Sequence, residues 1–216
     1  MLIDLHCHTT RSMDSFLTPE EAVQGARACG LDALCFTEHD KEWGDEEARR
    51  FGRDHEFIVL RGVEVSTEIG HVLAFGLRRF DLGMRNFADL ADEASESNGA
   101  LILAHPYRRF YGMRVPPEPS EDDLVLAMQR RGWPSLDAIE AWNAETRRAE
   151  NLLAQAVAER LMLPTTGGSD AHRQSDVARC YTRIDGAVAD ERDLVAAIHE
   201  RRVEGATSDA AAEAIG

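Results

Sequence analysis

Short apolar runs alternate along most of the chain with longer segments of helical spacing. The runs predict strands at about 2–8, 33–39, 57–65, 71–75, 100–105, 137–142, a short stretch before 168, and 180–184. The segments between them predict helices at about 19–29, 42–54, 86–98, 121–131, 145–161 and 190–201. Strands that alternate with helices favour a parallel α/β architecture, and about seven of these strands could close a barrel.

Local signals mark several of the expected boundaries. Thr18, Pro19 and Glu21 have the pattern of a helix start with a capping box, and Gly30 suits the residue after that helix. The stretch 106–119 contains four prolines and has no clear period, which predicts a long functional loop or lid. We expect a single domain over residues 1–205, followed by a small, polar tail at 206–216 that frays.

The chain has 216 residues and a net charge of −15. This length fits one domain, and such a charge disfavours a long nucleic acid as the main partner. Apolar runs are too short for a membrane span, and no signal peptide is visible, so we expect no membrane association and a cytoplasmic location. Four cysteines without a CxxC pair predict reduced, packed thiols rather than a zinc–thiolate site.

Histidines and acids gather where the predicted strands end. Six of the eight histidines lie at or beside such an end, together with three carboxylates: His6, His8, His39, His71, His105 and His172, with Asp14, Glu64 and Asp170. The carboxyl ends of barrel strands meet at one rim. Polar groups crowded there would repel and desolvate one another without a cation. His55 and His199 lie in helical or polar contexts and are expected at the surface.

The spacing of these residues suits divalent metal ions. His6 and His8 are two residues apart, so on one strand their side chains point to the same face, and Asp170 and His172 repeat this spacing. Alone, each such pair or single residue is also explained by a buried or surface polar group. Together, a mixed set of imidazoles and carboxylates suits Zn²⁺, Mn²⁺ or Fe²⁺.

Five motifs carry a resemblance to a known family. Residues 4–14, 37–40, 62–66, 104–106 and 168–172 are similar, in this order, to the motifs of the PHP (polymerase and histidinol phosphatase) family. Amidohydrolase barrels also begin with HxH, and many bridge two metals through a carboxylated lysine. The sole lysine, Lys41, lies just after the His39 run, so Glu64 is the better bridging candidate.

The resemblance implies a distorted (β/α)7 barrel that holds two or three divalent metal ions and hydrolyses phosphoesters. Carried over by motif, one metal takes His6, His8, Glu64 and Asp170, and another takes Asp14, His39 and His172. A third would share Glu64 and take His105. The chain departs from the three-metal pattern after the sixth strand, where it reads Glu140-Ala141-Trp142-Asn143, so Asn143 or His71 would complete that site, or the third metal would be absent.

These observations predict an enzyme that cleaves a small phosphomonoester or nucleotide with a metal-activated hydroxide. Glu64 would bridge the metals, and Arg108 and Arg179 would neutralise phosphoryl charge. His71 could be a ligand, a general acid or a supporting residue. Tyr107, Phe110 and Tyr111 would pack the loop or stack on a base or sugar. Two alternatives remain: an exonuclease-like phosphodiesterase acting on oligonucleotide ends, and a non-catalytic metal-binding module. The sequence predicts no oligomeric state.

Overall fold

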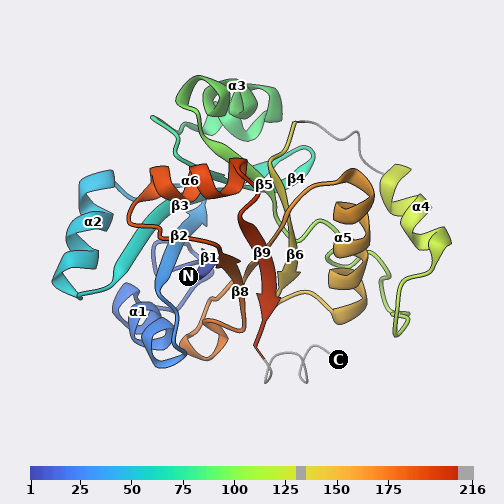
Figure 1. The fold of residues 1–216 in the computed structure, drawn as a ribbon, viewed down its shortest axis with the longest axis horizontal. Coiled ribbons are helices and arrows are strands. Elements are labelled where there is room, and N and C mark those ends of the chain that lie inside the picture. The colour runs from blue at the N-terminus through green and yellow to red at the C-terminus, as the bar shows by residue number, and fades with distance from the viewer. Residues whose placement is uncertain (130–134, 209–216) are drawn as a thin grey trace.

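One nine-stranded sheet curves into a nearly closed barrel in the computed structural model, which describes residues 1–129 and 135–208 (Figure 1). The strands are β1 (Leu2–Cys7), β2 (Ala33–His39), β3 (Ile58–Thr67), β4 (Gly70–Phe75), β5 (Ala100–Leu103), β6 (Ala138–Asn143), β7 (Thr165–Gly168), β8 (Cys180–Ile184) and β9 (Val203–Thr207). The helices are α1 (Pro19–Ala28), α2 (Asp45–Asp54), α3 (Phe87–Ser97), α4 (Glu121–Gln129), α5 (Arg148–Leu161) and α6 (Glu191–His199), with short 3₁₀ turns at Leu82–Arg85 and Gln174–Asp176.

The strand order is β7-β6-β5-β4-β3-β2-β1-β8-β9. Neighbouring strands pair in parallel from β1 to β3 and from β5 to β7, as expected from the alternation of strands and helices. β4 and β8 pair antiparallel with both of their neighbours, so the expectation of a wholly parallel sheet is wrong there. Only two residues separate β3 from β4, and a connection that short permits only a hairpin.

Side chains and tight backbone contacts join the two edges of the sheet. The Thr182 hydroxyl of β8 accepts a hydrogen bond from the backbone N–H of Gly167 at 2.9 Å and donates to its carbonyl at 2.8 Å. A Cβ atom on Gly167 would lie 2.4 Å from the Tyr181 carbonyl oxygen, so only glycine permits this approach. At its other end β7 meets β1, because the N–H of Asp170 donates to the His6 carbonyl at 2.8 Å.

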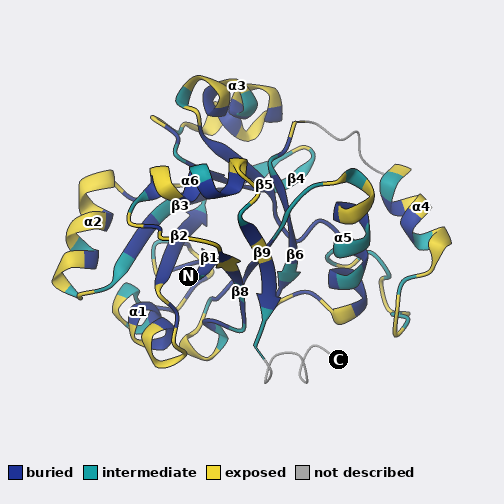
Figure 2. Ribbon diagram, in the orientation of Figure 1, coloured by how far each residue is buried: buried dark blue, intermediate teal, exposed yellow. Residues whose placement is uncertain are grey.

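Alternating residues of the strands pack two separate layers. In β2, Ala33 and Cys35 face the barrel interior, whereas Leu34 and Phe36 pack under α1 and α2. Residues of α6 complete the interior layer, and Figure 1 shows this helix lying across the sheet, with α1, α2, α3 and α5 around it. The strands are buried, and exposed residues lie mainly on the outer helices (Figure 2).

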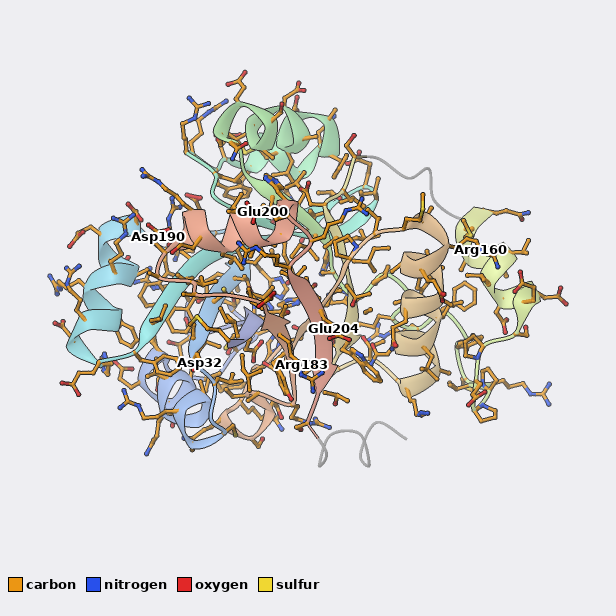
Figure 3. The ribbon with its side chains drawn as sticks, viewed as in Figure 1. Asp32, Arg160, Arg183, Asp190, Glu200 and Glu204 are labelled. Atoms are coloured by element: carbon orange, nitrogen blue, oxygen red, sulfur yellow. The ribbon has the colours of Figure 1, made fainter. Side chains whose placement is uncertain are left out.

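The α6 end of the barrel carries charged side chains. Asp190 and Glu200 flank α6, and the exposed register partners Arg183 and Glu204 lie on β8 and β9, as Figure 3 shows. Leu2 at the start of β1 pairs with Arg183, so this is the amino-terminal end of the parallel strands. Their carboxyl ends, where the candidate chemistry was expected, lie at the other end of the barrel.

The predictions for helix ends, the carboxyl-terminal tail and the cysteines are partly confirmed and partly wrong. Thr18 caps α1 in a capping box with Glu21, and Gly30 has a left-handed φ of 78°, as predicted. Strand β9 was not predicted and includes Ala206 and Thr207, so the tail begins later than expected. Residues 209–216, and the end of the helix predicted at 121–131, lie outside the described residues. Cys7, Cys35 and Cys180 are buried as expected, but Cys29 is exposed.

No helix among residues 1–129 and 135–208 is long and apolar enough to cross a membrane. The single-domain boundary and the cytoplasmic location stay predictions.

Candidate metal centre

The eight ligands predicted from the sequence come together at the carboxyl-terminal rim of the barrel. β1, β2, β3, β5 and β7 carry ligands at or near their carboxyl ends, and β4 contributes His71 from its amino end because it runs in the opposite direction. The residues in contact at this rim are His6, His8, Asp14, His39, Glu64, His71, His105, Asp170 and His172.

A register shift in β1 turns its two histidines into the barrel. Ile3 and Leu5 face the interior, and regular alternation would therefore place His6 and His8 on the outer face. The pairing of β1 with β2 shifts between Asp4 and Cys7, as at a β-bulge. Cys7 consequently packs with the outer layer, and both imidazoles point into the site.

Glu64 lies at the centre of the cluster and is fully buried. Its Oε1 lies 2.7 Å from Nδ1 of His71, 3.0 Å from Nε2 of His105 and 3.4 Å from Nε2 of His6. Its Oε2 lies 2.7 Å from Nδ1 of His39 and 3.3 Å from Nε2 of His8. One carboxylate therefore touches five imidazoles, as a group shared between neighbouring ions would.

Three donor atoms have the spacing that one small cation requires, and Glu64 lies beside two of them. Nε2 of His6 and Nε2 of His8 are 3.1 Å apart, and both lie 3.2–3.5 Å from Oδ1 of Asp170 and 3.3–3.4 Å from the oxygens of Glu64. Ligands at about 2.0–2.1 Å around a tetrahedral Zn²⁺ are separated by about 3.3–3.4 Å. Nε2 of His6, Nε2 of His8 and Oδ1 of Asp170 can therefore converge on one such ion, and Glu64 approaches each of the two histidines through a different oxygen.

A second set lies beside the first. Oδ2 of Asp14 is 3.2 Å from Nε2 of His39 and 3.4 Å from Nε2 of His172. The rings of His39 and His172 lie 4.2 and 4.6 Å from the ring of His8, and these three histidines can converge on one ion. His8, which the expected partition gave to the first metal, thus converges with His39 and His172, and the partition stays a prediction.

The third set expected from the motifs is divided between two groups that share Glu64. His6, Glu64 and His105 can converge on one ion, and so can His39, Glu64 and His71. Asn143, the other candidate for this set, uses its side-chain oxygen to accept hydrogen bonds from Glu145 and Thr146. Among the described residues, His71 is thus the better placed of the two.

Without a cation the cluster binds protons instead. Burial lowers the pKa of His6, but Glu140, Asp170 and Glu64 outweigh it and raise that pKa well above its usual range. Burial lowers the pKa of His8, but hydrogen bonds to Asp170 and Glu64 outweigh this effect and raise that pKa to about 9. Burial raises the pKa of Glu64, but the neighbouring imidazoles, His6 first, hold it well below its ordinary value.

The donor set fits divalent metal ions. Oε2 of Glu64 is buried without a hydrogen-bond partner among the described residues, although imidazoles surround it. Two Nε2 atoms, those of His6 and His8, face each other inside the same set. A cation satisfies all of these atoms at once and releases the protons that the apo cluster holds.

Two buried acids at this rim were not assigned a role from the sequence. Glu140 lies 2.9 Å from Nδ1 of His6, and Glu38 accepts hydrogen bonds from Thr9 and Ser12 next to His8. The sequence signal was present, since Glu38 precedes His39 directly and Glu140 lies near the end of the sixth predicted strand.

The two predicted arginines lie in different places. Arg108 donates to Oδ2 of Asp170 at 3.0 Å and therefore lies at the cluster. Arg179 makes no hydrogen bond or ion pair with the cluster among the described residues, and its predicted role in neutralising phosphoryl charge stays a prediction. It lines a cavity of about 1350 Å³ formed by Met113, residues 115–118 and residues 144–149.

This cavity adjoins the cluster through Arg108 and Asn143. Arg108 reaches Glu145 in the cavity wall at 4.0 Å, and Asn143, which contacts Asp170 at 3.4 Å, directly precedes the wall segment. Tyr107, Phe110 and Tyr111 pack against α4 and α5, which confirms the packing interpretation for these aromatics. Loop 106–119 therefore forms a wall of the cavity, and its role as a lid stays a prediction.

Comparisons with known proteins agree with the geometry. Residues 4–139 match the model of the PHP domain, and residues 148–203 match a PHP-associated model. A 5′-3′ exoribonuclease of Haemophilus influenzae is 41% identical over 64 residues, which are 30% of this chain and 23% of that protein. A 3′,5′-nucleoside bisphosphate phosphatase of Chromobacterium violaceum is 37% identical over 79 residues, which are 35% of this chain and 27% of that protein.

The chain thus spans about a quarter of the length of each of these relatives. A solved two-domain protein of Bacteroides vulgatus, described as containing a predicted PHP-like metal-dependent phosphoesterase, has the same fold with a TM-score of 0.68. Its identity is 19%, over 96% of this chain and 64% of that one. The rim of histidines and acids, the barrel and the match over residues 4–139 together lead to one conclusion: this chain belongs to the PHP-domain family.

Proposed function

We propose that the protein is a metal-dependent phosphoesterase that hydrolyses a small phosphomonoester or nucleotide. The observation that carries this proposal is the buried Glu64 carboxylate, whose two oxygens touch imidazoles from β1, β2, β4 and the loop after β5. Two or three divalent ions, Zn²⁺, Mn²⁺ or Fe²⁺, would be held by His6, His8, Asp14, His39, Glu64, His71, His105, Asp170 and His172.

The protein's own groups would prepare the reaction. Bound divalent ions lower the pKa of water toward 7 and neutralise phosphoryl oxygens. Glu64 sets the spacing of the ions because both of its oxygens lie inside the cluster. Arg108, one-third exposed beside Asp170, can turn its guanidinium to a phosphoryl oxygen. His71 would share an ion with His39 and Glu64, His105 would share one with His6 and Glu64, and the general-acid role of His71 stays a prediction.

The size and charge of the adjoining cavity favour a small anionic substrate. Arg147, Arg148 and Arg179 line it with Glu118 and Glu145, so it is locally cationic in a chain of net charge −15. An open pocket of about 1350 Å³ accommodates a nucleotide or sugar phosphate. The named activity of the Chromobacterium violaceum relative supports this substrate class.

The runner-up is an exonuclease-like activity on oligonucleotide ends, which the Haemophilus influenzae relative favours. The net charge of −15 counts against it, because a polynucleotide track normally requires a cationic surface. A non-catalytic module is the third possibility, and the intact set of ligands counts against it.

One panel separates these activities. The purified chain is stripped of metal, reloaded with Zn²⁺, Mn²⁺ or Fe²⁺, and assayed on phosphomonoesters, nucleoside bisphosphates, dinucleotides and single-stranded oligonucleotides. We expect turnover of a phosphomonoester or bisphosphate that requires metal and is abolished by Glu64→Gln. Preferential release of mononucleotides from oligonucleotides would support the runner-up, and metal binding without any turnover would support the non-catalytic module.

A further inference from the structure

Two buried carboxylates flank the cluster without touching the space where its ligand atoms converge. Glu140 on β6 is 1% exposed and Glu38 on β2 is fully buried. They approach from opposite sides, since Glu140 contacts His6 and His105 whereas Glu38 contacts the turn that follows His8. Isolated buried carboxylates are costly, so both must be compensated by donors.

Among the described residues, Glu140 faces two N–H groups and one imidazole nitrogen. Its Oε2 accepts from the backbone N–H of His105 at 2.9 Å and from the side-chain amide of Asn143 at 3.0 Å. Its Oε1 lies 2.9 Å from Nδ1 of His6. A carboxylate acts here as acceptor only, so Nδ1 of His6 carries the proton and Nε2 is left free to point its lone pair into the cluster.

The same acid holds His105 in an unusual conformation. His105 has a φ of 26°, in the region that non-glycine residues rarely adopt, and its N–H is the one that Glu140 accepts. Glu140 thereby controls two ligands that lie on the same side of Glu64.

Glu38 acts on His8 through Ser12. Glu38 accepts the hydroxyl proton of Ser12 at 2.6 Å, and it also accepts from Thr9 and from the indole N–H of Trp43. The Ser12 oxygen then has only lone pairs left. It accepts from the backbone N–H of His39 at 3.1 Å and faces Nδ1 of His8 at 3.4 Å. Nδ1 of His8 must therefore be the donor, and Nε2 is again free for a metal.

We propose that Glu140 and Glu38 are positioning residues that fix the tautomers of His6 and His8, so that Nε2 of both rings faces the metal ions. This inference rests on the proposed metal centre. Replacement by glutamine keeps size and shape but reverses one hydrogen bond at each acid. In Glu140→Gln the amide oxygen stays with the two donors at Oε2, so the NH₂ faces His6 and moves its proton to Nε2.

Glu38→Gln has the corresponding effect on the other histidine. The oxygen stays at the Oε1 position with the indole N–H of Trp43, which cannot reverse, and with the backbone N–H of Thr9 at 3.3 Å. The NH₂ takes the Oε2 position, where it faces Ser12 and loses the 3.0 Å hydrogen bond from the Thr9 N–H. The Ser12 hydroxyl then turns its proton toward His8 and shifts that ring to the opposite tautomer. Each variant is therefore expected to change the tautomer of one histidine and to leave the tautomer of the other unchanged.

Long-range ¹H–¹⁵N NMR of the histidine rings in the Zn²⁺-loaded full chain reads these tautomers directly. We expect the wild type to show His6 and His8 with protonated Nδ1 and zinc-bound Nε2. Glu140→Gln should lose this signature at His6 only, and Glu38→Gln at His8 only. Zn²⁺ affinity, measured by competition with a chromophoric chelator, should fall about 10- to 100-fold in each variant.

Glu93→Gln is the matched control, because Glu93 is also buried but lies on α3, where Ser97 and Arg79 hold it away from the cluster. It should retain both tautomers and the wild-type Zn²⁺ affinity. Both rings keeping their tautomers in the two cluster variants would overturn the inference.

The wild-type spectrum alone is decisive if a variant does not fold. Zinc bound through Nδ1 of His6 or His8 would overturn the inference and leave the proposed function intact. A wild-type chain that binds no Zn²⁺, Mn²⁺ or Fe²⁺ would overturn both.

Discussion

Gly168→Ala tests whether the close contact of β7 with β1 builds the site. A Cβ atom at position 168 would lie 2.3 Å from Cβ of His6, 2.7 Å from Oε1 of Glu140 and 2.9 Å from the backbone nitrogen of His6. Ordinary contacts of such an atom begin at 3.4 Å, so the first distance is 1.1 Å too short (3.4 minus 2.3). Cβ and the backbone nitrogen of His6 move only with the backbone of β1, and the strands must therefore separate.

Overpacking of this kind costs about 1–3 kcal/mol, and a displacement of backbone by 1 Å belongs at the upper end. About 3 kcal/mol corresponds to a fall of about 6–12 °C in melting temperature for a chain of this size. Because the clash is with His6 itself, Zn²⁺ affinity should also fall by about tenfold or more.

Gly30→Ala is the matched control. Nothing lies within 4 Å of a Cβ there, but φ is +78°, so alanine costs about 1–2 kcal/mol through backbone strain alone. Urea unfolding of the metal-free protein and Zn²⁺ titration are measured for both variants. The reasoning is refuted if Gly168→Ala unfolds at the wild-type urea concentration, or if it binds Zn²⁺ as tightly as Gly30→Ala does.

Other expectations follow from the same structure. Glu64→Gln should lower phosphoesterase activity by about 100-fold or more, whereas His55→Gln should retain it, and equal rates at saturating metal would contradict the bridging role. Zn²⁺ at about 100 times its dissociation constant should stabilise the chain by about 2.7 kcal/mol, which thermal unfolding before and after chelation would measure. Iodoacetamide should label the exposed Cys29 of the native chain and spare Cys180, whose pKa burial raises to about 12; mass spectrometry locates the label. In the metal-free protein the pKa of His8 is raised from 6.5 to about 9, so its contribution to stability is complete below about pH 6.5 and is lost as pH rises through 9; urea unfolding across this range should show that decline.

Much of the site could be predicted because strand ends are visible in a sequence. Glu64 and His39 are register partners on adjacent parallel strands, and both end apolar runs. Parallel strands of a barrel end at one rim, so residues 25 positions apart become neighbours without any knowledge of side-chain packing. His71 lies at the same rim although it begins its strand, because β4 runs antiparallel to β3 and starts where β3 ends.

Other features depend on tertiary pairing and leave no periodic signal. β9 has a glycine and an alanine where a strand former is expected, and it is a strand because Gly205 approaches β7 so closely that a Cβ there would lie 2.4 Å from the Thr166 carbonyl. The register shift in β6 between Glu140 and Trp142 is likewise a property of the paired strands. It allows both Glu140 and Asn143 to contact the cluster, although they are three residues apart.

Two ligand residues at the rim have strained backbone conformations that only distant parts of the chain stabilise. The geometry of the site could therefore not be predicted from any single segment. His105 and Asp170 both have positive φ, at 26° and 53°, and such conformations cost about 1–3 kcal/mol unless the surroundings stabilise them. In each case the residue's backbone N–H donates a hydrogen bond to another strand. His105 donates to the Glu140 carboxylate of β6, and Asp170 donates to the His6 carbonyl of β1. The acceptors lie 35 and 164 residues away in the chain (140 minus 105, and 170 minus 6), so closure of the barrel is what stabilises the ligand geometry. Loss of the β1–β7 contact should therefore reduce metal affinity before it unfolds the chain.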